Sequence, residues 1–223
     1  MPTILELRHA ECESPGAYAA GLADVADIHT VRAWREPIPH DPSSYAAIIV
    51  MGGPMGADDG PRLPWIDDEI GLLRRASASD TPIWAVCLGS QLLAAALGSE
   101  ISTGPAPEIG LLDVSLTEDG RRDPVWSSHP DPVVEVLQWH FDTFSLPPGA
   151  VRLASSPAYP NQLFRHGHSY GIQFHLEVGS AQLAEWLDVP STARSSTPCS
   201  ARVASRESWP MSPARNRSRI RSR

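Results

Sequence analysis

A cysteine at position 87 stands between two segments of different character. The segment PIWAV before it is typical of a buried strand, and LGSQLLAAALG after it is typical of a helix that Gly98 closes. The small residues Ala85 and Gly89 suit a tight strand-to-helix turn that lifts a reactive side chain above the sheet. The amides and positive dipole at the start of the helix would stabilise a thiolate, so Cys87 is a candidate nucleophile. The alternative is that Cys87 is a small buried hydrophobic side chain.

A histidine and a glutamate lie close together much later in the chain. In YGIQFHLEV, His175 and Glu177 are separated by one residue, so they project to the same side of an extended segment. His175 could take a proton from Cys87, and Glu177 could hold the second ring nitrogen, as a Cys-His-carboxylate triad requires. The chain has eight histidines, and a structural role for His175 is the alternative.

A glycine-rich loop, GGPMG at 52–56, directly follows the strand-like run AAIIVM. Glycine lets the backbone bend so that an amide can face an incoming carbonyl oxygen, and the amide of Leu88 would supply a second donor. The position favours this interpretation because open α/β sheets bind ligands beyond the carboxyl ends of their strands. An ordinary Gly/Pro turn is the alternative.

These candidate residues need a sheet to bring them together, and the order of the predicted elements indicates one. Strand-like runs alternate with helical ones through the first half, which is the βαβ rhythm of an α/β protein. The strands predicted here are 3–8, 28–33, 46–52 and 82–86, and the helices are 18–25, 65–76 and 88–98. Shorter strands at 111–116, 133–139, 151–155, 161–164 and 169–174 should extend or flank the sheet, and a last helix covers 181–187.

The composition changes abruptly after Pro190. With 223 residues and 42% hydrophobic content, the chain can fill the core of one large α/β domain, which we expect over residues 1–190. Residues 191–223 hold eight of the 18 basic residues and one of the 26 acidic ones. They show almost no aliphatic periodicity, so the sequence predicts a disordered, basic Arg/Ser/Pro-rich tail.

Membrane insertion and secretion are not expected. No apolar run approaches the roughly 18 residues that span a bilayer, and the N-terminal segment lacks the features of a secretory signal, so we expect a cytoplasmic protein. The sequence contains no CxxC pair, so it gives no sign of a structural zinc site. The basic tail could contact nucleic acid nonspecifically, but the acidic domain and the absence of interleaved aromatic residues favour a solvated tail.

Taken together, the GGP loop, VCLGSQLLA and GIQFHLE resemble class I glutamine amidotransferases, the Cys-His-Glu triad family. Within that family, WIDDE, EIG at 108–110, QWHFDTFSLPPGA and LASSPAYPNQLF are most similar to small stand-alone proteins related to the glutaminase domain of GMP synthase. The resemblance covers about residues 1–187. It implies a flavodoxin-like, three-layer α/β/α fold with a mostly parallel sheet, and a reaction that needs no metal or organic cofactor.

The resemblance also implies hydrolysis of a γ-glutamyl amide through a cysteinyl thioester. Cys87 would be the nucleophile, His175 the general base and then the general acid, and Glu177 the partner that orients the imidazole. Attack of the thiolate would give a tetrahedral oxyanion, ammonia would leave with a proton from His175, and water would cleave the acyl-enzyme.

Binding roles carry over from the same resemblance. Gly53 and Leu88 would donate the amides of the oxyanion hole, and Gln91, one helical turn past the nucleophile, would contact the bound glutamine. His140 and Asp142 occupy a segment that lies beside the substrate pocket in the family. A structural turn is the alternative for these two residues, and neither is predicted to be catalytic.

The sequence departs from the family pattern at several points. Ala85 replaces the usual first glycine of the elbow, Leu176 stands where many relatives have proline, and Phe141 stands where glycine is common. None of these changes removes a reacting group. Relatives normally complete a helix after the segment AEWL, whereas this chain continues into the Arg/Ser/Pro-rich sequence. A shifted reading frame with loss of the final helix is one hypothesis for that tail.

Three functions fit the sequence. The first is a glutaminase that supplies ammonia to a synthetase on a separate polypeptide, because the chain shows no ATP-binding P-loop of its own. The second is a self-sufficient γ-glutamyl hydrolase or peptidase that uses the same triad on another γ-glutamyl compound. The third is an inactive, triad-bearing binding module. Dependence on a partner separates the first two, and covalent labelling of Cys87 by a glutamine-analogue electrophile separates both from the third.

Overall fold

The strands and helices of the computed structural model lie within residues 1–187, the part of the chain that the structure describes. The expected tail over 191–223 lies outside the described residues. The strands are β1 (Thr3–Arg8), β2 (Asp27–Arg32), β3 (Ala47–Val50), β4 (Ile83–Val86), β5 (Ile101–Leu116), β6 (Val133–Phe144), β7 (Val151–Ser155), β8 (Leu163–His166) and β9 (Ser169–Ile172). The helices are α1 (Gly16–Leu22), α2 (Trp65–Ala78), α3 (Leu88–Ala96), α4 (Glu118–Arg122) and α5 (Ser180–Leu187).

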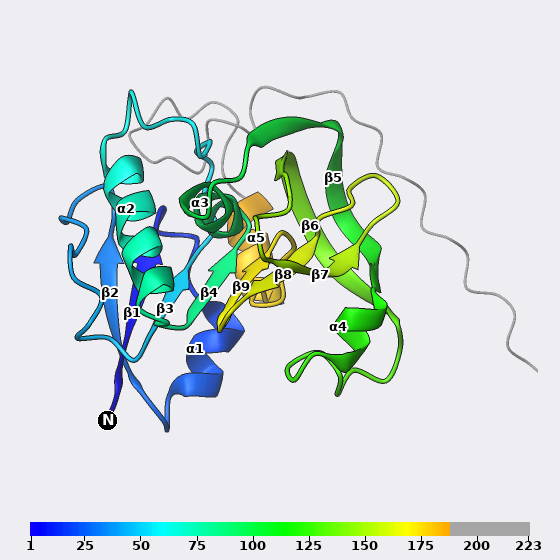
Figure 1. Cartoon of the computed structure of the whole chain (residues 1–223), viewed down its shortest axis with the longest axis horizontal. Coiled ribbons are helices and arrows are strands. Elements are labelled where there is room, and N and C mark those ends of the chain that lie inside the picture. The colour runs from blue at the N-terminus through cyan, green and yellow to red at the C-terminus, as the bar shows by residue number, and fades with distance from the viewer. Residues whose placement is uncertain (188–223) are drawn as a thin grey trace, which may run out of the picture.

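All nine described strands form one sheet in the order β2-β1-β3-β4-β9-β8-β7-β5-β6. The pairs from β2 to β9 are parallel, and those from β9 to β6 are antiparallel. Strand β9 therefore joins two differently built halves, as Figure 1 shows near the centre of the sheet. The α/β prediction is confirmed, and the short strands of the second half extend the sheet as expected.

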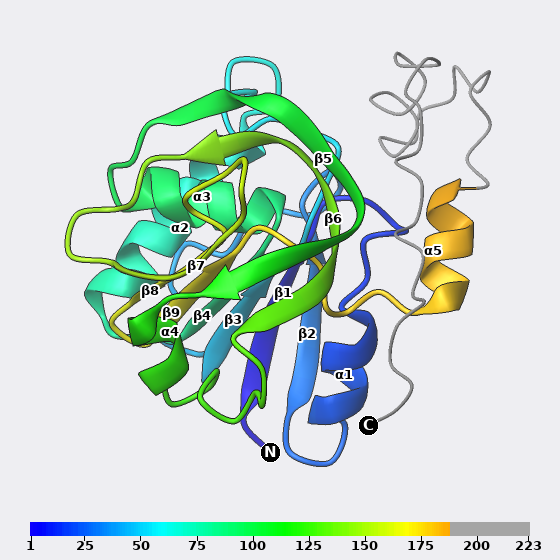
Figure 2. The same cartoon turned by 90° about the vertical axis from the view of Figure 1, so that its right-hand side faces the viewer.

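Helices cover both faces of the parallel half. Helices α2 and α3 lie on one face, and α1 and α5 lie on the other (Figure 2). The buried stripe of α2 includes Ile66, Leu72 and Leu73, which pack in the main core together with apolar residues of α3 and of the sheet. This is the three-layer arrangement that the sequence predicts.

Strand β5 is much longer than the sequence indicates. It has 16 residues, whereas only 111–116 show a strand pattern. The missed part contains Pro105 and Pro107, which cannot donate to a ladder, and the pairing with β6 shifts register between Thr103 and Glu108. The resulting ribbon of β5 and β6 forms an arched edge of the sheet (Figure 2) and carries the later part of β6 toward the carboxyl ends of the parallel strands.

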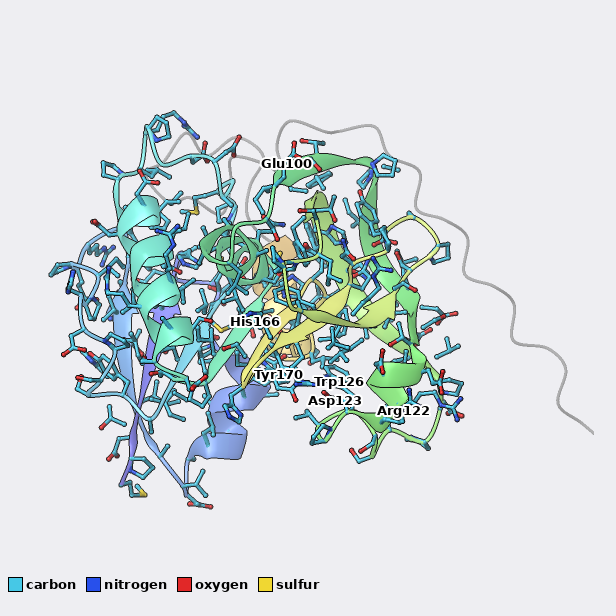
Figure 3. The ribbon with its side chains drawn as sticks, in the orientation of Figure 1. Glu100, Arg122, Asp123, Trp126, His166 and Tyr170 are labelled. Atoms are coloured by element: carbon cyan, nitrogen blue, oxygen red, sulfur yellow. The ribbon has the colours of Figure 1, made fainter. Side chains whose placement is uncertain are left out.

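A buried carboxylate attaches the end of α4 to the sheet. Asp123 accepts a hydrogen bond from Arg165 Nε at 2.9 Å and from the Tyr170 hydroxyl at 3.1 Å. Figure 3 shows Asp123 and Tyr170 side by side at this junction. Because α4 lies between β5 and β6 in the chain, these contacts help to fix the ribbon.

The described helices give no indication of a membrane span. Over residues 1–187, none of them combines the length and the apolar character that crossing a bilayer requires.

Candidate active site

The turn between β4 and α3 holds Cys87 in a strained backbone conformation. Its φ is 50° and its ψ is −110°, a combination that side chains with a Cβ rarely adopt. The Cys87 amide donates to the carbonyl of Ile172 at 2.7 Å, which links this turn to β9. A Cβ on Gly89 would lie 2.4 Å from the Val50 carbonyl oxygen, so the predicted need for a small residue at position 89 has a direct steric cause.

The loop after β9 places His175 and Glu177 in direct contact. Nδ1 of His175 lies 2.7 Å from Glu177 Oε1, and the other carboxylate oxygen accepts the Leu176 amide at 3.0 Å. Both side chains are buried. Because the carboxylate is the acceptor, Nδ1 carries the proton, and Nε2 is left to exchange a proton with another group.

Cys87 and His175 are electrostatically coupled. Burial alone would lower the pKa of His175, but the charge of Glu177, the charge of Cys87 and hydrogen bonds with both residues raise this pKa well above 6.5. An imidazolium beside a sulfur favours the thiolate, which is the reactive form of cysteine. The structure thus brings together the three residues that sequence reasoning proposed as a triad.

The start of helix α1 contacts the backbone of the loop that carries Glu177. The Ala17 amide donates to the Glu177 carbonyl at 3.0 Å. Gly16 has a φ of +45°, and a Cβ there would lie 2.2 Å from the same carbonyl oxygen, so only glycine fits this turn. The start of α1 therefore helps to set where the carboxylate sits.

The glycine loop after β3 and the start of α3 face the same space. Within residues 1–187, the amides of Gly53 and Leu88 donate to no acceptor. The Leu88 amide is one of the unpaired donors at the start of a helix, where the dipole favours negative charge. These two amides are the pair that sequence reasoning assigned to an oxyanion hole.

A cavity of about 90 Å³ opens over these groups. Its walls include Gly53, Cys87, Leu88, Gln91 and His175. All the predicted site residues therefore line this cavity except Glu177, which contacts the far side of the His175 ring. The volume suits one small side chain, so the cavity can hold the end of an amino-acid-sized substrate next to the sulfur.

The side-chain amide of Gln91 is held by two protein acceptors. Its Nε2 atom lies 3.4 Å from the Asp142 carbonyl and 3.3 Å from Gln173 Oε1. Both distances are long for N–H···O hydrogen bonds, so they are weak. Gln91 lines the cavity, with its amide directed toward the end of β6, and its contact with a bound glutamine stays a prediction.

Both ring nitrogens of His140 have hydrogen-bond partners, which hold the ring in place. Its Nδ1 donates to the Asp142 carbonyl at 3.1 Å, and its Nε2 lies 3.0 Å from the carboxylate of Glu108. Ser156 also donates to this carboxylate at 2.7 Å. Burial would raise the pKa of Glu108, but its hydrogen bonds with His140 and Ser156 hold that pKa below its usual range. With both ring nitrogens engaged, His140 forms part of the cavity wall together with Asp142.

Sequence reasoning missed Glu13, a carboxylate at the edge of the cavity. Its Oε2 atom is buried and has no hydrogen-bond partner within residues 1–187, although the residue as a whole is partly exposed. Burial raises its pKa to about 7, and the charge of Glu177 adds to this, while His175 and His9 oppose it. Its place soon after β1, at the same edge of the parallel sheet as Cys87, is the signal that could have found it.

Two tryptophans also escaped the sequence prediction. Trp186 of α5 stands edge-on to His175, with ring centroids 5.0 Å apart, and edge-on to Trp139 of β6 at 5.9 Å. Its Nε1 donates to the Cys12 carbonyl at 2.9 Å. The indole thus closes one side of the cavity, a role that the short pattern AEWL does not reveal.

The assembled groups fit acyl transfer: a thiol beside a basic imidazole, a carboxylate that orients the ring, and two amides for a developing negative charge. Within residues 1–187, no group of three or more His, Cys, Asp and Glu side chains is arranged to hold a metal ion.

Known proteins share both the sequence and the fold. Residues 24–187 match the family model for glutamine amidotransferase class-I. The glutamine amidotransferase-like protein YfeJ of Salmonella typhimurium is 33% identical over 175 residues, which span 76% of this chain and 73% of that protein. The glutamine-hydrolyzing GMP synthase of Nitrosomonas eutropha is 33% identical over 145 residues, 60% of this chain but only 26% of that protein. The crystal structure of a glutamine amidotransferase from Thermotoga maritima superposes with a TM-score of 0.78 at 31% identity, covering 83% of this chain and 80% of that one.

Proposed function

Because this chain belongs to the class I glutamine amidotransferase family, we propose that it hydrolyses the side-chain amide of glutamine through a thioester on Cys87. The observation that carries the proposal is the contact chain from Cys87 through His175 to Glu177, with the sulfur at a strained strand-to-helix turn. Strain of this kind is kept where function requires it. The products are glutamate and ammonia.

The first half of the reaction forms the acyl-enzyme. The Cys87 thiolate attacks the amide carbon of glutamine, and the carbonyl oxygen becomes an oxyanion that faces the amides of Gly53 and Leu88. When the tetrahedral intermediate collapses, the carbon–nitrogen bond breaks and His175 gives its Nε2 proton to the leaving nitrogen. Ammonia departs, and the glutamyl group remains as a thioester on the sulfur.

The second half releases glutamate. His175, now neutral at Nε2, takes a proton from a water molecule while the water oxygen attacks the thioester carbon. Collapse of this second intermediate breaks the carbon–sulfur bond and restores the Cys87 thiolate and the protonated imidazole. Glu177 keeps Nδ1 protonated in both halves, so one nitrogen handles every transfer.

Delivery of ammonia to another polypeptide is part of the proposal. The GMP synthase relative is named as glutamine-hydrolyzing, and the match covers 26% of that protein. The matched region is thus one section of a larger protein there. By this likeness we propose an ammonia-accepting synthetase as the partner of the site on residues 1–187.

The test is a substrate panel with glutamine, γ-glutamyl peptides and γ-glutamyl amines, following release of ammonia or amine. Cys87→Ala is the control that removes the sulfur, and its rate should fall by several orders of magnitude. Hydrolysis of glutamine that depends on Cys87 supports the proposal. Turnover confined to other γ-glutamyl compounds would instead identify a self-sufficient γ-glutamyl hydrolase.

An inactive binding module predicts a different result. Such a protein would release nothing from any substrate, and a glutamine-analogue electrophile would fail to label Cys87 in the folded chain. Equal rates for the unmodified chain and Cys87→Ala would also reject the proposed chemistry.

A further inference from the structure

A second buried histidine–carboxylate pair lies directly beneath the glycine loop. His9 follows β1, Glu69 lies in α2, and both side chains are fully buried. Nε2 of His9 is 3.0 Å and 3.1 Å from the two carboxylate oxygens of Glu69. A fully buried ion pair rarely stabilises a fold more than apolar side chains of the same size would. Stability therefore does not explain why His9 and Glu69 are buried together, and a functional role is the alternative.

The other nitrogen of His9 contacts the backbone of the glycine loop. Nδ1 lies 3.0 Å from the Gly52 carbonyl oxygen. A carbonyl oxygen can only accept, so Nδ1 carries a proton and donates it. Trp65 stacks on the imidazole with centroids 5.6 Å apart and planes at 12°, which leaves the ring little freedom to turn.

The bonded carbonyl belongs to the same peptide unit as the Gly53 amide. No described peptide bond is cis, and in a trans peptide the C=O and the N–H point in opposite directions. A hydrogen bond that holds the Gly52 oxygen on the His9 side therefore directs the Gly53 N–H away from His9. Gly53 lines the cavity beside Cys87, and within residues 1–187 its amide has no acceptor.

Within residues 1–187, the His9 ring is the only hydrogen-bond partner of the Gly52 carbonyl oxygen. Glycine at positions 52 and 53 permits rotation that other residues would resist. A Cβ on Gly53 would lie 2.8 Å from the Cβ of His9, so the backbone is packed closely against the histidine. Close packing sets the position of the loop, while the Nδ1 bond sets the direction of its peptide.

We propose that His9 and Glu69 hold the Gly52–Gly53 peptide in one orientation, so that the Gly53 amide stays directed at the oxygen that gains negative charge. Both are positioning residues, since neither touches substrate. This inference rests on the proposed hydrolysis and adds to it a second dyad, which orients an oxyanion donor as Glu177 orients His175. The donated bond also polarises the peptide and makes its N–H a stronger donor.

The charges around His9 also favour a ring that donates to both the Gly52 carbonyl and Glu69. Burial lowers the pKa of His9, but the charge and hydrogen bond of Glu69, the bond to Gly52 and the charge of Glu13 together raise it above 6.5. A ring protonated on both nitrogens donates to Gly52 and to Glu69 at once.

Two near-isosteric variants separate the two contacts of His9. Asparagine places its amide nitrogen where Nδ1 lies, so His9→Asn keeps a donor for the Gly52 oxygen. Glutamine places its amide nitrogen near Nε2, so His9→Gln keeps a contact at position 69 and loses the one to Gly52. Both are made in a Glu69→Gln background, so that no buried carboxylate loses its partner, and Glu69→Gln alone is the reference.

We expect His9→Gln to lower kcat for glutamine by about 100-fold relative to the reference, the usual cost of one oxyanion donor. His9→Asn should retain most of the reference rate. The γ-aldehyde analogue of glutamine, which forms a tetrahedral adduct with the thiol, should bind more weakly to His9→Gln by a similar factor. Alkylation of Cys87 by iodoacetamide, which builds no oxyanion, should proceed equally in both variants.

The inference is overturned if the two variants lose activity equally, if neither loses activity, or if iodoacetamide alkylation falls in parallel with kcat. Crystal structures of both variants give a readout that does not depend on turnover. If no γ-glutamyl compound is hydrolysed even by the unmodified chain, the proposed function fails, and these structures still decide the inference. The same Gly52–Gly53 peptide orientation in His9→Gln as in His9→Asn would reject it.

Discussion

The indole of Trp186 stands edge-on against the imidazole of His175, with ring centroids 5.0 Å apart and planes at 79°. The hydrogen bond from Trp186 Nε1 to the Cys12 carbonyl fixes the indole in turn. The imidazole of His175 is therefore held on two sides, by the Glu177 carboxylate at Nδ1 and by an aromatic edge at the ring. Precise placement of the ring matters because small displacements of a reacting group are costly in rate.

We expect Trp186→Ala to lower kcat/KM for glutamine by about tenfold or more, since a loosened imidazole spends less time aligned with the sulfur. Trp186→Phe keeps an aromatic edge and loses only the bond to Cys12, so its loss should be smaller. Steady-state kinetics and thermal unfolding, measured together, separate misplacement from unfolding. Folded Trp186→Ala with unchanged kcat/KM would show that the indole does not position the ring.

Removing the charge of Glu177 should shift the pH dependence of turnover. The Glu177 charge raises the pKa of His175, so Glu177→Gln lowers that pKa. The midpoint of the alkaline limb of the pH–rate profile, where the imidazolium loses its proton, should move to lower pH. Turnover should fall by about 100-fold or more, yet by less than in Cys87→Ala. A midpoint that stays in place would contradict the coupling.

Glu13 should make the protein less stable as pH rises. Its folded pKa of about 7 exceeds the ordinary value of 4.5, so the folded state binds the proton more tightly than the unfolded state does. Its contribution is thus most favourable below pH 4.5 and is lost between pH 4.5 and 7, by at most about 3 to 4 kcal/mol at about 1.4 kcal/mol per pKa unit.

Glu13→Gln should therefore be more stable than the unmodified chain at pH 8, and the difference should shrink as pH falls toward 4.5. Denaturant unfolding at several pH values measures it. The exposed residue Glu100, labelled in Figure 3, offers a matched control, because Glu100→Gln should leave the pH dependence unchanged. Parallel stability curves for Glu13→Gln and the unmodified chain would remove the burial argument.

Two glycines in helices give a matched test of steric fit. Gly89→Ala would place a Cβ 2.4 Å from the Val50 carbonyl oxygen, so α3 must shift, at a cost of about 1–3 kcal/mol in the free energy of unfolding. Gly21→Ala in α1 meets no neighbour within 4 Å and should stabilise by up to about 1 kcal/mol. Activity should fall only in Gly89→Ala, because the shift carries Cys87 and the Leu88 amide with it. Equal stability of the two variants would contradict this.

The parallel half of the fold and the residues at its edge were accessible from the sequence because their signals are local. Strand–helix alternation predicts an α/β protein with βαβ units, the family resemblance adds the three layers, and a cysteine between a buried strand and a glycine-containing helix marks one strand end. Glu177 lies two residues from His175, so the sequence places both side chains on one side of an extended segment, and the loop after β9 holds them in contact.

The remaining features depend on contacts between distant segments. From the sequence, Glu69 is expected to be an acidic residue in the first turns of a helix, where the helix dipole favours negative charge. In the structure it is buried against His9. The prolines at 105 and 107 hide the first part of β5, and nothing local to Trp186 indicates that it meets His175. Partners of this kind appear only when the register of the sheet is known.

Strand β9 lies beside β4, although the chain leaves β4 at Val86 and returns only at Ser169. During synthesis, the ribosome therefore completes Cys87 well before it makes His175. A nascent chain that has folded only through α3 carries a sulfur without its imidazole. The contact between Cys87 and His175 can then form only after β9 has joined β4.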